Sequence, residues 1–157
     1  MLGNPHFYRS TIRNYVIAFG SMFNDVQVKR TNSAGAVLST IDVPLAYGPT
    51  QKYLSRVNKK TTAGQAAIVL PRMSFEISGF QYAADRKLSK VGKLTKQNHA
   101  TDVNKKNVVY QPVPYDIGFT LSIMTKNADD ATQIVEQILP YFTPSFVIPI
   151  KEASEIG

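Results

Sequence analysis

Residues 115–139 constrain the fold most tightly, because their apolar pattern changes period partway along. From 115 to 123 every second residue is large and apolar, which is typical of a half-buried strand: Tyr115, Ile117, Phe119, Leu121 and Ile123. From 131 to 139 the spacing is helical: Ala131, Ile134, Val135, Ile138 and Leu139. Asn127, Asp129 and Asp130 favour a helix start, and Pro140 favours its end. The pattern predicts a helix packed on a sheet, with core residues Ile134, Val135, Ile138, Leu139, Phe119 and Leu121.

Shorter patterns predict the remaining elements. Asn4-Pro5 favours a helix start and an apolar stripe continues to Phe23, so we expect a helix over residues 5–23. Strand-like runs at 25–30 and 37–43, joined by a polar loop, predict a hairpin. The other expected elements are a short helix at 51–57, a long strand at 68–82 with a bulge or bend at Gly79, and a last strand at 146–150. Together these predict an α/β (α+β) fold, a mixed sheet with flanking helices, in one domain of residues 1–157.

The composition limits the class of protein. The chain has 157 residues, 43% of them hydrophobic, which is enough for a packed core. It has no cysteine, which excludes disulfides, thiolate metal sites and cysteine nucleophiles. No apolar run approaches the roughly 18–20 residues that span a bilayer, and the N-terminal residues do not have the pattern of a secretory signal. We therefore expect folding in a reducing cytoplasm, without a membrane anchor.

The positive charge is concentrated in one segment. The net charge is +7, and residues 86–106 carry seven Lys or Arg against Asp102 alone, so the rest of the chain is close to neutral. We interpret residues 84–107 as a basic arm. Its candidate partner-binding residues are cations spaced three or four apart, with apolar residues between them: Arg86, Lys87, Leu88, Lys90, Val91, Lys93, Leu94 and Lys96.

This spacing predicts an amphipathic turn that forms on contact with an acidic, partly apolar protein surface. A solvated loop and a nucleic-acid contact are the alternatives. No aromatic residue is interleaved with these cations, so base stacking is not indicated.

The sequence offers no set of residues that would support catalysis. His6 and His99 have no spaced partners, whereas a metal site needs three or four converging ligands. Asp129 and Asp130 are explained by their place in the first turn of a helix. The phosphate-binding glycine motifs and the GxSxG motif are absent. We therefore expect neither an enzyme nor a cofactor or metal site.

Four stretches resemble the proximal tail sheath stabiliser and tail completion family of T4-like contractile-tailed phages. They are DVQVKR at 25–30, VPLAY at 43–47, IVLPR at 68–72 and, most specifically, QIVEQILPYFTP at 133–144. The resemblance runs in the same order from about residue 6 to residue 150, and the basic arm is its least similar part. Chains of this family usually continue well past the equivalent of Ile150 with further strands. The chain is therefore either a compact relative or one that lacks a C-terminal part.

The resemblance implies a structural protein of the virion, assembled in the host cytoplasm. It implies a ring, expected to be a hexamer, that ends the tail at its head-proximal side and presents a surface to the neck. The implied partners are further copies of the chain, the tail sheath and tube proteins and the neck proteins; DNA would pass through the ring without specific binding. The alternative function is a nucleic-acid-binding module that acts through the basic arm, whose binding would weaken steeply with salt.

Overall fold

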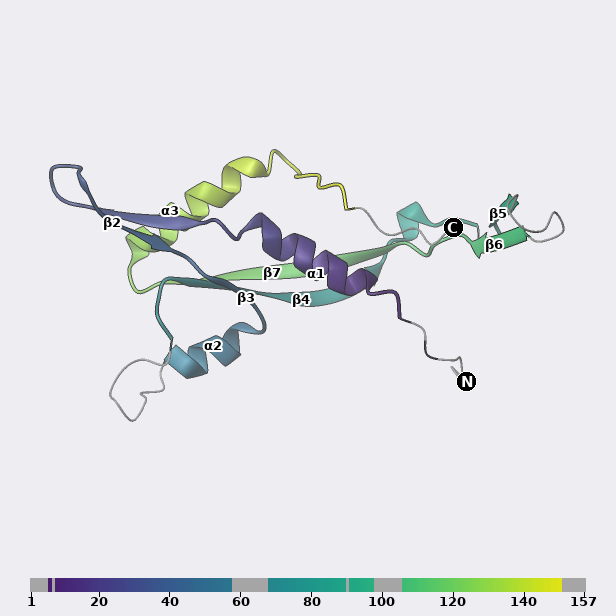
Figure 1. The fold of residues 1–157 in the computed structure, drawn as a ribbon, viewed down its shortest axis with the longest axis horizontal. Helices are drawn as coiled ribbons and strands as arrows, with labels where there is room; N and C mark the ends of the chain where they lie inside the picture. The colour runs from purple at the N-terminus through teal and green to yellow at the C-terminus, as the bar shows by residue number, and fades with distance from the viewer. Residues whose placement is uncertain (1–5, 7, 58–67, 90, 98–105, 151–157) are drawn as a thin grey trace. The chain divides into compact units, whose positions relative to one another are not determined.

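The structure, a computed structural model, describes residues 6, 8–57, 68–89, 91–97 and 106–150 (Figure 1). The helices and mixed strands of this part confirm the predicted α/β class. The chain divides into two compact units, which are residues 1–76 with 120–151, and residues 77–119 with 152–157. The boundary falls inside two strands and not in a linker, so a single domain over 1–157 stays a prediction.

The first unit contains most of the predicted elements. In chain order they are α1 (Thr11–Met22), β1 (Gln27–Thr31), β2 (Val37–Asp42), β3 (Leu45–Tyr47), α2 (Thr50–Val57), the first part of β4 (Arg72–Tyr82), the last part of β7 (Tyr115–Met124), α3 (Ala128–Ile138) and the 3-10 turn η2 (Leu139–Tyr141). β1 and β2 form the predicted antiparallel hairpin. β3 pairs in parallel with β4, and the strand order is β3-β4-β7.

Helix α1 begins later than predicted. The expected start at Asn4-Pro5 lies outside the described residues. The chain becomes helical only after Ser10, whose φ of 58° is left-handed and interrupts a helical path. Near the other end, Gly20 permits close packing on β4, since a β-carbon at position 20 would lie 3.2 Å from Cζ of Phe75. The glycine thus serves packing against the sheet.

The core of the first unit is formed by residues from both helices and strands. Its main cluster draws buried residues from α1, β1, the β2–β3 connection, β4 and α3: Phe23, Val28, Val43, Met73 and Ile134. A smaller cluster joins α2, the chain before β4 and the end of β7: Tyr53, Ile68 and Met124. Because α3 and the hairpin contribute to the same cluster, their mutual placement is fixed by burial of apolar side chains.

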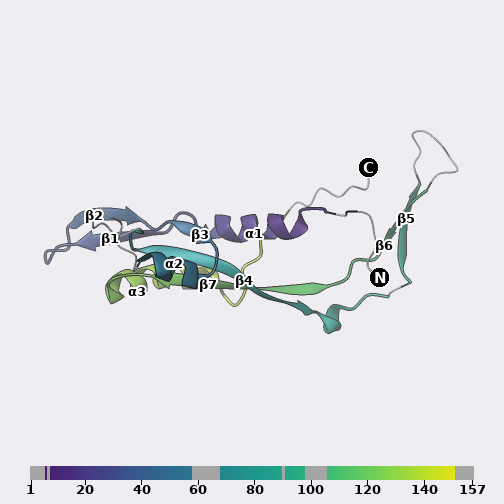
Figure 2. The same ribbon diagram turned by 90° about the horizontal axis from the view of Figure 1, so that it is seen from below.

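Glutamine side chains of α3 also bond to the backbone of β1. Oε1 of Gln137 accepts from the Gln27 N–H at 3.4 Å, and Nε2 of the same side chain donates to the Gln27 carbonyl at 2.8 Å. One turn earlier, Oε1 of Gln133 accepts from the Lys29 N–H at 3.1 Å. Four helical residues rise by about 6 Å and two strand residues by about 6.6 Å, so the two spacings match. The glutamines therefore bond along one edge of β1, while β2 pairs with the other edge. Figure 2 shows α3 beside the β1–β2 hairpin.

The expected core stripe of α3 is narrower than predicted. Ile134 is fully buried, and Ile138 and Leu121 pack half-buried against the main cluster. Val135 is 38% exposed and Leu139 61% exposed, so neither lies in the core. Val135 lies about 100° around the helix from Ile134, and at Leu139 the backbone leaves the α-helix for η2. The other strand residue of the predicted core, Phe119, is half-buried in the second unit.

The second unit contains a hairpin within the predicted arm. Its described elements are the remainder of β4, the 3-10 turn η1 (Ala84–Arg86), β5 (Lys93–Gln97), β6 (Lys106–Tyr110) and the first part of β7. β5 and β6 pair antiparallel, with Lys93 opposite Tyr110. β4 continues as a strand through Gly79, where a bend was expected.

One further prediction is wrong. Residues 145–150 form no strand in the described structure, because no neighbouring strand supplies backbone hydrogen bonds there. Asn127 precedes α3 as predicted, but its side chain makes no capping hydrogen bond. Its carbonyl instead accepts from the Thr125 hydroxyl at 2.9 Å.

Candidate protein-docking site

The candidate site is the basic segment of the second unit, which the structure presents as η1 followed by the β5–β6 hairpin. The Gly92 carbonyl accepts from the Gln111 N–H at 3.2 Å, which continues the pairing beyond the strands. The Ala83 N–H donates to the Pro114 carbonyl at 3.2 Å and so closes the base of the segment. The guanidinium of Arg86 pairs with the Asp116 carboxylate of β7. These bonds give the described part of the arm a defined backbone.

The expected amphipathic turn is not present. Leu88 and Val91 lie in irregular chain between η1 and β5, and Leu94 lies in a strand. A spacing of three residues places side chains on one face only in a helix, so the three do not form the predicted stripe. They are nevertheless accessible, at 48%, 82% and 57% exposed. Lys90 lies outside the described residues, and the side chain of Lys96 is not described.

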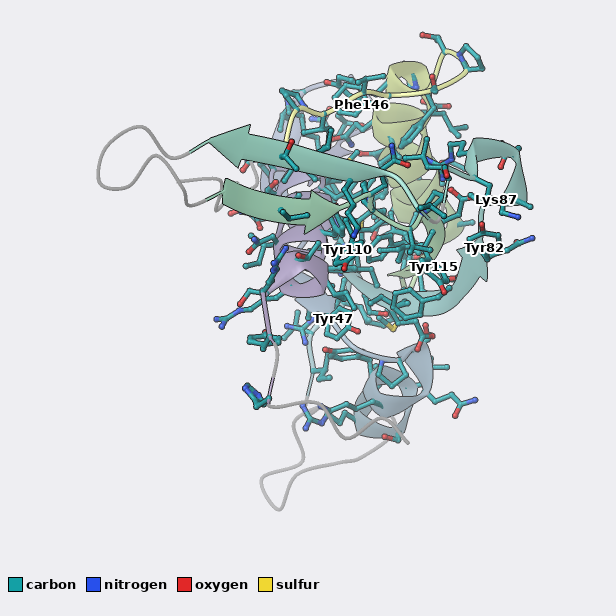
Figure 3. The ribbon with its side chains drawn as sticks, turned by 90° about the vertical axis from the view of Figure 1, so that its right-hand side faces the viewer. Tyr47, Tyr82, Lys87, Tyr110, Tyr115 and Phe146 are labelled. Carbon is teal, nitrogen blue, oxygen red and sulfur yellow. The ribbon has the colours of Figure 1, made fainter. Side chains whose placement is uncertain are left out.

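Hairpin pairing brings aromatic rings to the cations, which the sequence analysis missed. The Lys93 ammonium lies 5.3 Å from the ring centre of Tyr110, within reach of a cation–π interaction. At the base of the segment, Tyr82 and Tyr115 meet edge to face with centres 5.8 Å apart (Figure 3). All three tyrosines are at least 40% exposed. The β-branched and aromatic residues of VVY at 108–110 were the available signal for the second strand.

Tyrosine and arginine side chains are enriched among the residues that dominate protein–protein contacts. The described part of the second unit offers these groups with Arg86, Lys87 and Lys93 among them. The arrangement therefore suits a protein partner with acidic groups around an apolar contact.

An apolar hollow of about 520 Å³ lies in the first unit. Its walls come from the end of α1, the end of α3 and the chain that follows: Met22, Phe23, Val26, Ile138, Phe142 and Phe146 among others. Phe146 also contacts the rings of Tyr141 and Phe142, at 6.2 Å and 6.4 Å between centres. The hollow holds the start of the last described segment against the unit.

The residues considered for catalysis do not converge in the described structure. His6 is exposed, and His99 lies outside the described residues. Asp130 is buried and pairs with Arg30 of β1 at 3.3 Å, so it has a structural role beyond the helix start that was predicted. The described residues contain no group of three or more His, Cys, Asp or Glu side chains placed to hold a metal ion. Among the described helices, none is both long and apolar enough to cross a membrane.

The chain belongs to a family of structural tail proteins. Residues 6–157 match the family described as T4-like virus Myoviridae tail sheath stabiliser, which covers almost the whole chain. The chain is also similar to the tail completion protein gp15 of Enterobacteria phage T4, with 34% identity over 147 residues. That alignment covers 90% of this chain and 52% of the relative, so the chain spans about half the length of the T4 protein. The family predicted from the four sequence stretches is thereby confirmed.

Proposed function

We propose that this chain completes the contractile tail at its head-proximal end. Copies of the chain form a ring, a hexamer, that holds the ends of the tail sheath and tube and offers a surface to the neck proteins. The family match over residues 6–157 is the observation that carries this proposal. The T4 relative, named a tail completion protein, supports it over about half of its length.

The basic segment, which consists of η1 and the β5–β6 hairpin and is called the basic hairpin below, gives this role a physical basis. Its cations would guide a subunit onto an acidic neighbour, since electrostatic attraction mainly sets encounter rate and register. Leu88, Val91, Leu94 and the exposed tyrosines would then supply the apolar contact that holds the complex. We propose that the neighbour is either the next subunit of the ring or the sheath, and that the protein works without catalysis or a cofactor.

Two measurements test the proposal. Light scattering of the purified chain gives the mass of the assembly, and a mass that stays at one subunit at all concentrations would contradict the ring. Purified chain is then added to tails that were assembled without it, and electron microscopy counts tails with an extended sheath. We expect the fraction of extended sheaths to rise with added chain.

Binding of nucleic acid through the arm is the competing function. One feature favours it: Tyr110, an exposed ring, lies beside Lys93 and could stack on a base. Phosphate-driven binding loses orders of magnitude in affinity between low and moderate salt. A DNA affinity that falls in this way, together with unchanged sheath extension in a Lys93→Glu variant, would favour this function over the first.

A further inference from the structure

The hairpin of the first unit has one covered edge and one open edge. In an antiparallel pair, residues alternate between those that exchange backbone hydrogen bonds and those whose N–H and C=O point outward. The Val43 N–H donates to the Val26 carbonyl at 2.9 Å, which sets the phase of this alternation. The backbone N–H groups of Gln27 and Lys29 accordingly point outward from β1, where they donate to the glutamine side chains of α3.

The same phase gives the outward residues of β2. Thr40 pairs opposite Lys29 and Asp42 opposite Gln27, so their backbone groups point away from β1. In the described ranges no backbone group bonds to this edge of β2. The strand VLSTID contains neither lysine nor proline, and Val37 and Leu38 are 56% and 69% exposed. Its register with β1 shifts at Leu38, so the regular part of the edge runs from Ser39 to Asp42. A regular edge without a paired strand readily accepts another strand.

The same chain also carries a strand-like segment that pairs with no strand among the described residues. Residues 145–150, SFVIPI, alternate in exposure: Phe146, Ile148 and Ile150 are 46%, 37% and 38% exposed, whereas Val147 is 84% exposed. Figure 1 shows the chain running on from α3 and η2 without a further helix or strand in its described part. The sequence favours a strand at this point, and the described residues of one subunit provide no strand beside it.

Proline restricts how this segment can pair. In a strand, the N–H and C=O of residues 146, 148 and 150 point to one edge, and those of 145, 147 and 149 to the other. Pro149 has no N–H, so the second edge cannot pair fully. The segment is therefore suited to be added at the edge of a sheet through Phe146, Ile148 and Ile150, and not to be an interior strand.

We propose that residues 145–150 of one copy add a strand to the open edge of β2 in the next copy. The proposal deepens the proposed ring and rests on it. Each chain carries both the donor segment and the acceptor edge, so the contact is head to tail, the type that closes into a ring. Phe146, held at the hollow beside α3, anchors the segment, and the backbone of Thr40 and Asp42 in the neighbour receives it.

Cysteine crosslinking tests this pairing, because the chain has no cysteine of its own. Two single variants are mixed, Val147→Cys with either Ser39→Cys or Thr40→Cys, and treated with a short bismaleimide. We expect crosslinked dimers on a denaturing gel. Gln51→Cys, at an exposed site of α2, replaces the β2 variant as the control and should give none. Since each copy carries one cysteine, a dimer reports a contact between copies only.

A matched pair of proline variants tests the edge. Ile148→Pro removes an N–H from the proposed pairing edge, whereas Val147→Pro removes one from the edge that Pro149 already interrupts. We expect Ile148→Pro to weaken assembly by about tenfold in concentration, as the loss of one hydrogen bond would, and Val147→Pro to leave it nearly unchanged. Sedimentation over a concentration series measures both.

The outcomes separate the pairing from the ring. A parent chain of ring mass whose mixtures give no dimers would overturn the strand addition and leave the ring standing. Equal effects of the two proline variants would also overturn it. Crosslinks found only within one copy, in a Thr40→Cys and Val147→Cys double variant, would show that the segment folds back. A parent chain that stays monomeric would contradict the ring itself.

Discussion

The two hairpins of this protein are built alike and supported differently. β1–β2 buries Val28 completely and has α3 bonded along one edge. Among the side chains described in β5 and β6, by contrast, none is buried. The first hairpin is therefore part of the folded core, and the second gains little from its own packing. A hairpin that contributes little to stability can keep exposed apolar and cationic groups for a partner.

The largest loss of stability is expected at Ile134 of α3, which packs against the first hairpin. This side chain is fully buried in the cluster that includes Val28. Ile134→Ala should lower the free energy of unfolding by about 2–5 kcal/mol, the usual cost of a cavity in a core. Val135→Ala, at the more exposed neighbour, is the control and should cost clearly less. Urea titration measures both, and equal costs would mean that α3 packs through a different face.

The second largest loss of stability is expected at Asp130. It is buried and accepts a hydrogen bond from Arg30 of β1, whose own side chain is 46% exposed. Asp130→Ala should cost about 1–3 kcal/mol, the range for a hydrogen bond with charged partners. Asp129→Ala removes an exposed carboxylate from the same turn and should cost about 0.3–1 kcal/mol. If thermal unfolding showed the two variants equal, the pair with Arg30 would contribute nothing.

The glutamine contacts should contribute about 1 kcal/mol each. Gln137→Glu keeps an acceptor for the Gln27 N–H but loses the donor to the Gln27 carbonyl, which separates the two bonds. We expect it to cost about 1 kcal/mol, and Glu136→Gln, at an exposed neighbouring position, to cost close to nothing. Hydrogen exchange at the Gln27 amide gives a second readout, because protection there should fall only when the contact with α3 is lost.

The same difference between local and long-range contacts explains which elements of the fold could be predicted from the sequence. β7 and α3 have long patterns of a single period, and their predicted limits agree with the structure to within one or two residues. In the arm the three-residue spacing of Leu88, Val91 and Leu94 suggested a turn, although pairing between β5 and β6 decides the structure. Strand pairing depends on residues distant in sequence, so a local pattern cannot supply it.

The remaining errors have the same cause. Residues 146–150 have the composition of a strand but pair with no strand in the part of the subunit that the structure describes. Leu139 fits the helical stripe, yet the backbone has already entered η2 at that point. In the candidate site, Arg86, Lys87 and Lys93 were predicted from charge alone. The tyrosines beside them were missed, because Tyr82 and Tyr115 meet only when β4 and β7 are folded.

The smallest effect on stability is expected for variants of the basic hairpin. These variants also test most directly whether the two hairpins differ in function. One variant changes Lys90, Lys93 and Lys96 to Glu, and a second changes Leu88, Val91 and Leu94 to Ser. Leu88, Val91, Lys93 and Leu94 are exposed. Exposed substitutions usually alter stability by less than about 0.5 kcal/mol, so we expect both variants to unfold close to the parent. If the hairpin docks on an acidic protein, charge reversal should slow tail completion mainly at low salt, since salt screens the attraction. The serine variant should lower completion at every salt concentration, because it removes the apolar contact. Two variants that fold normally and complete tails as well as the parent would show that the segment is a solvated loop. The second hairpin would then have no role in binding a partner.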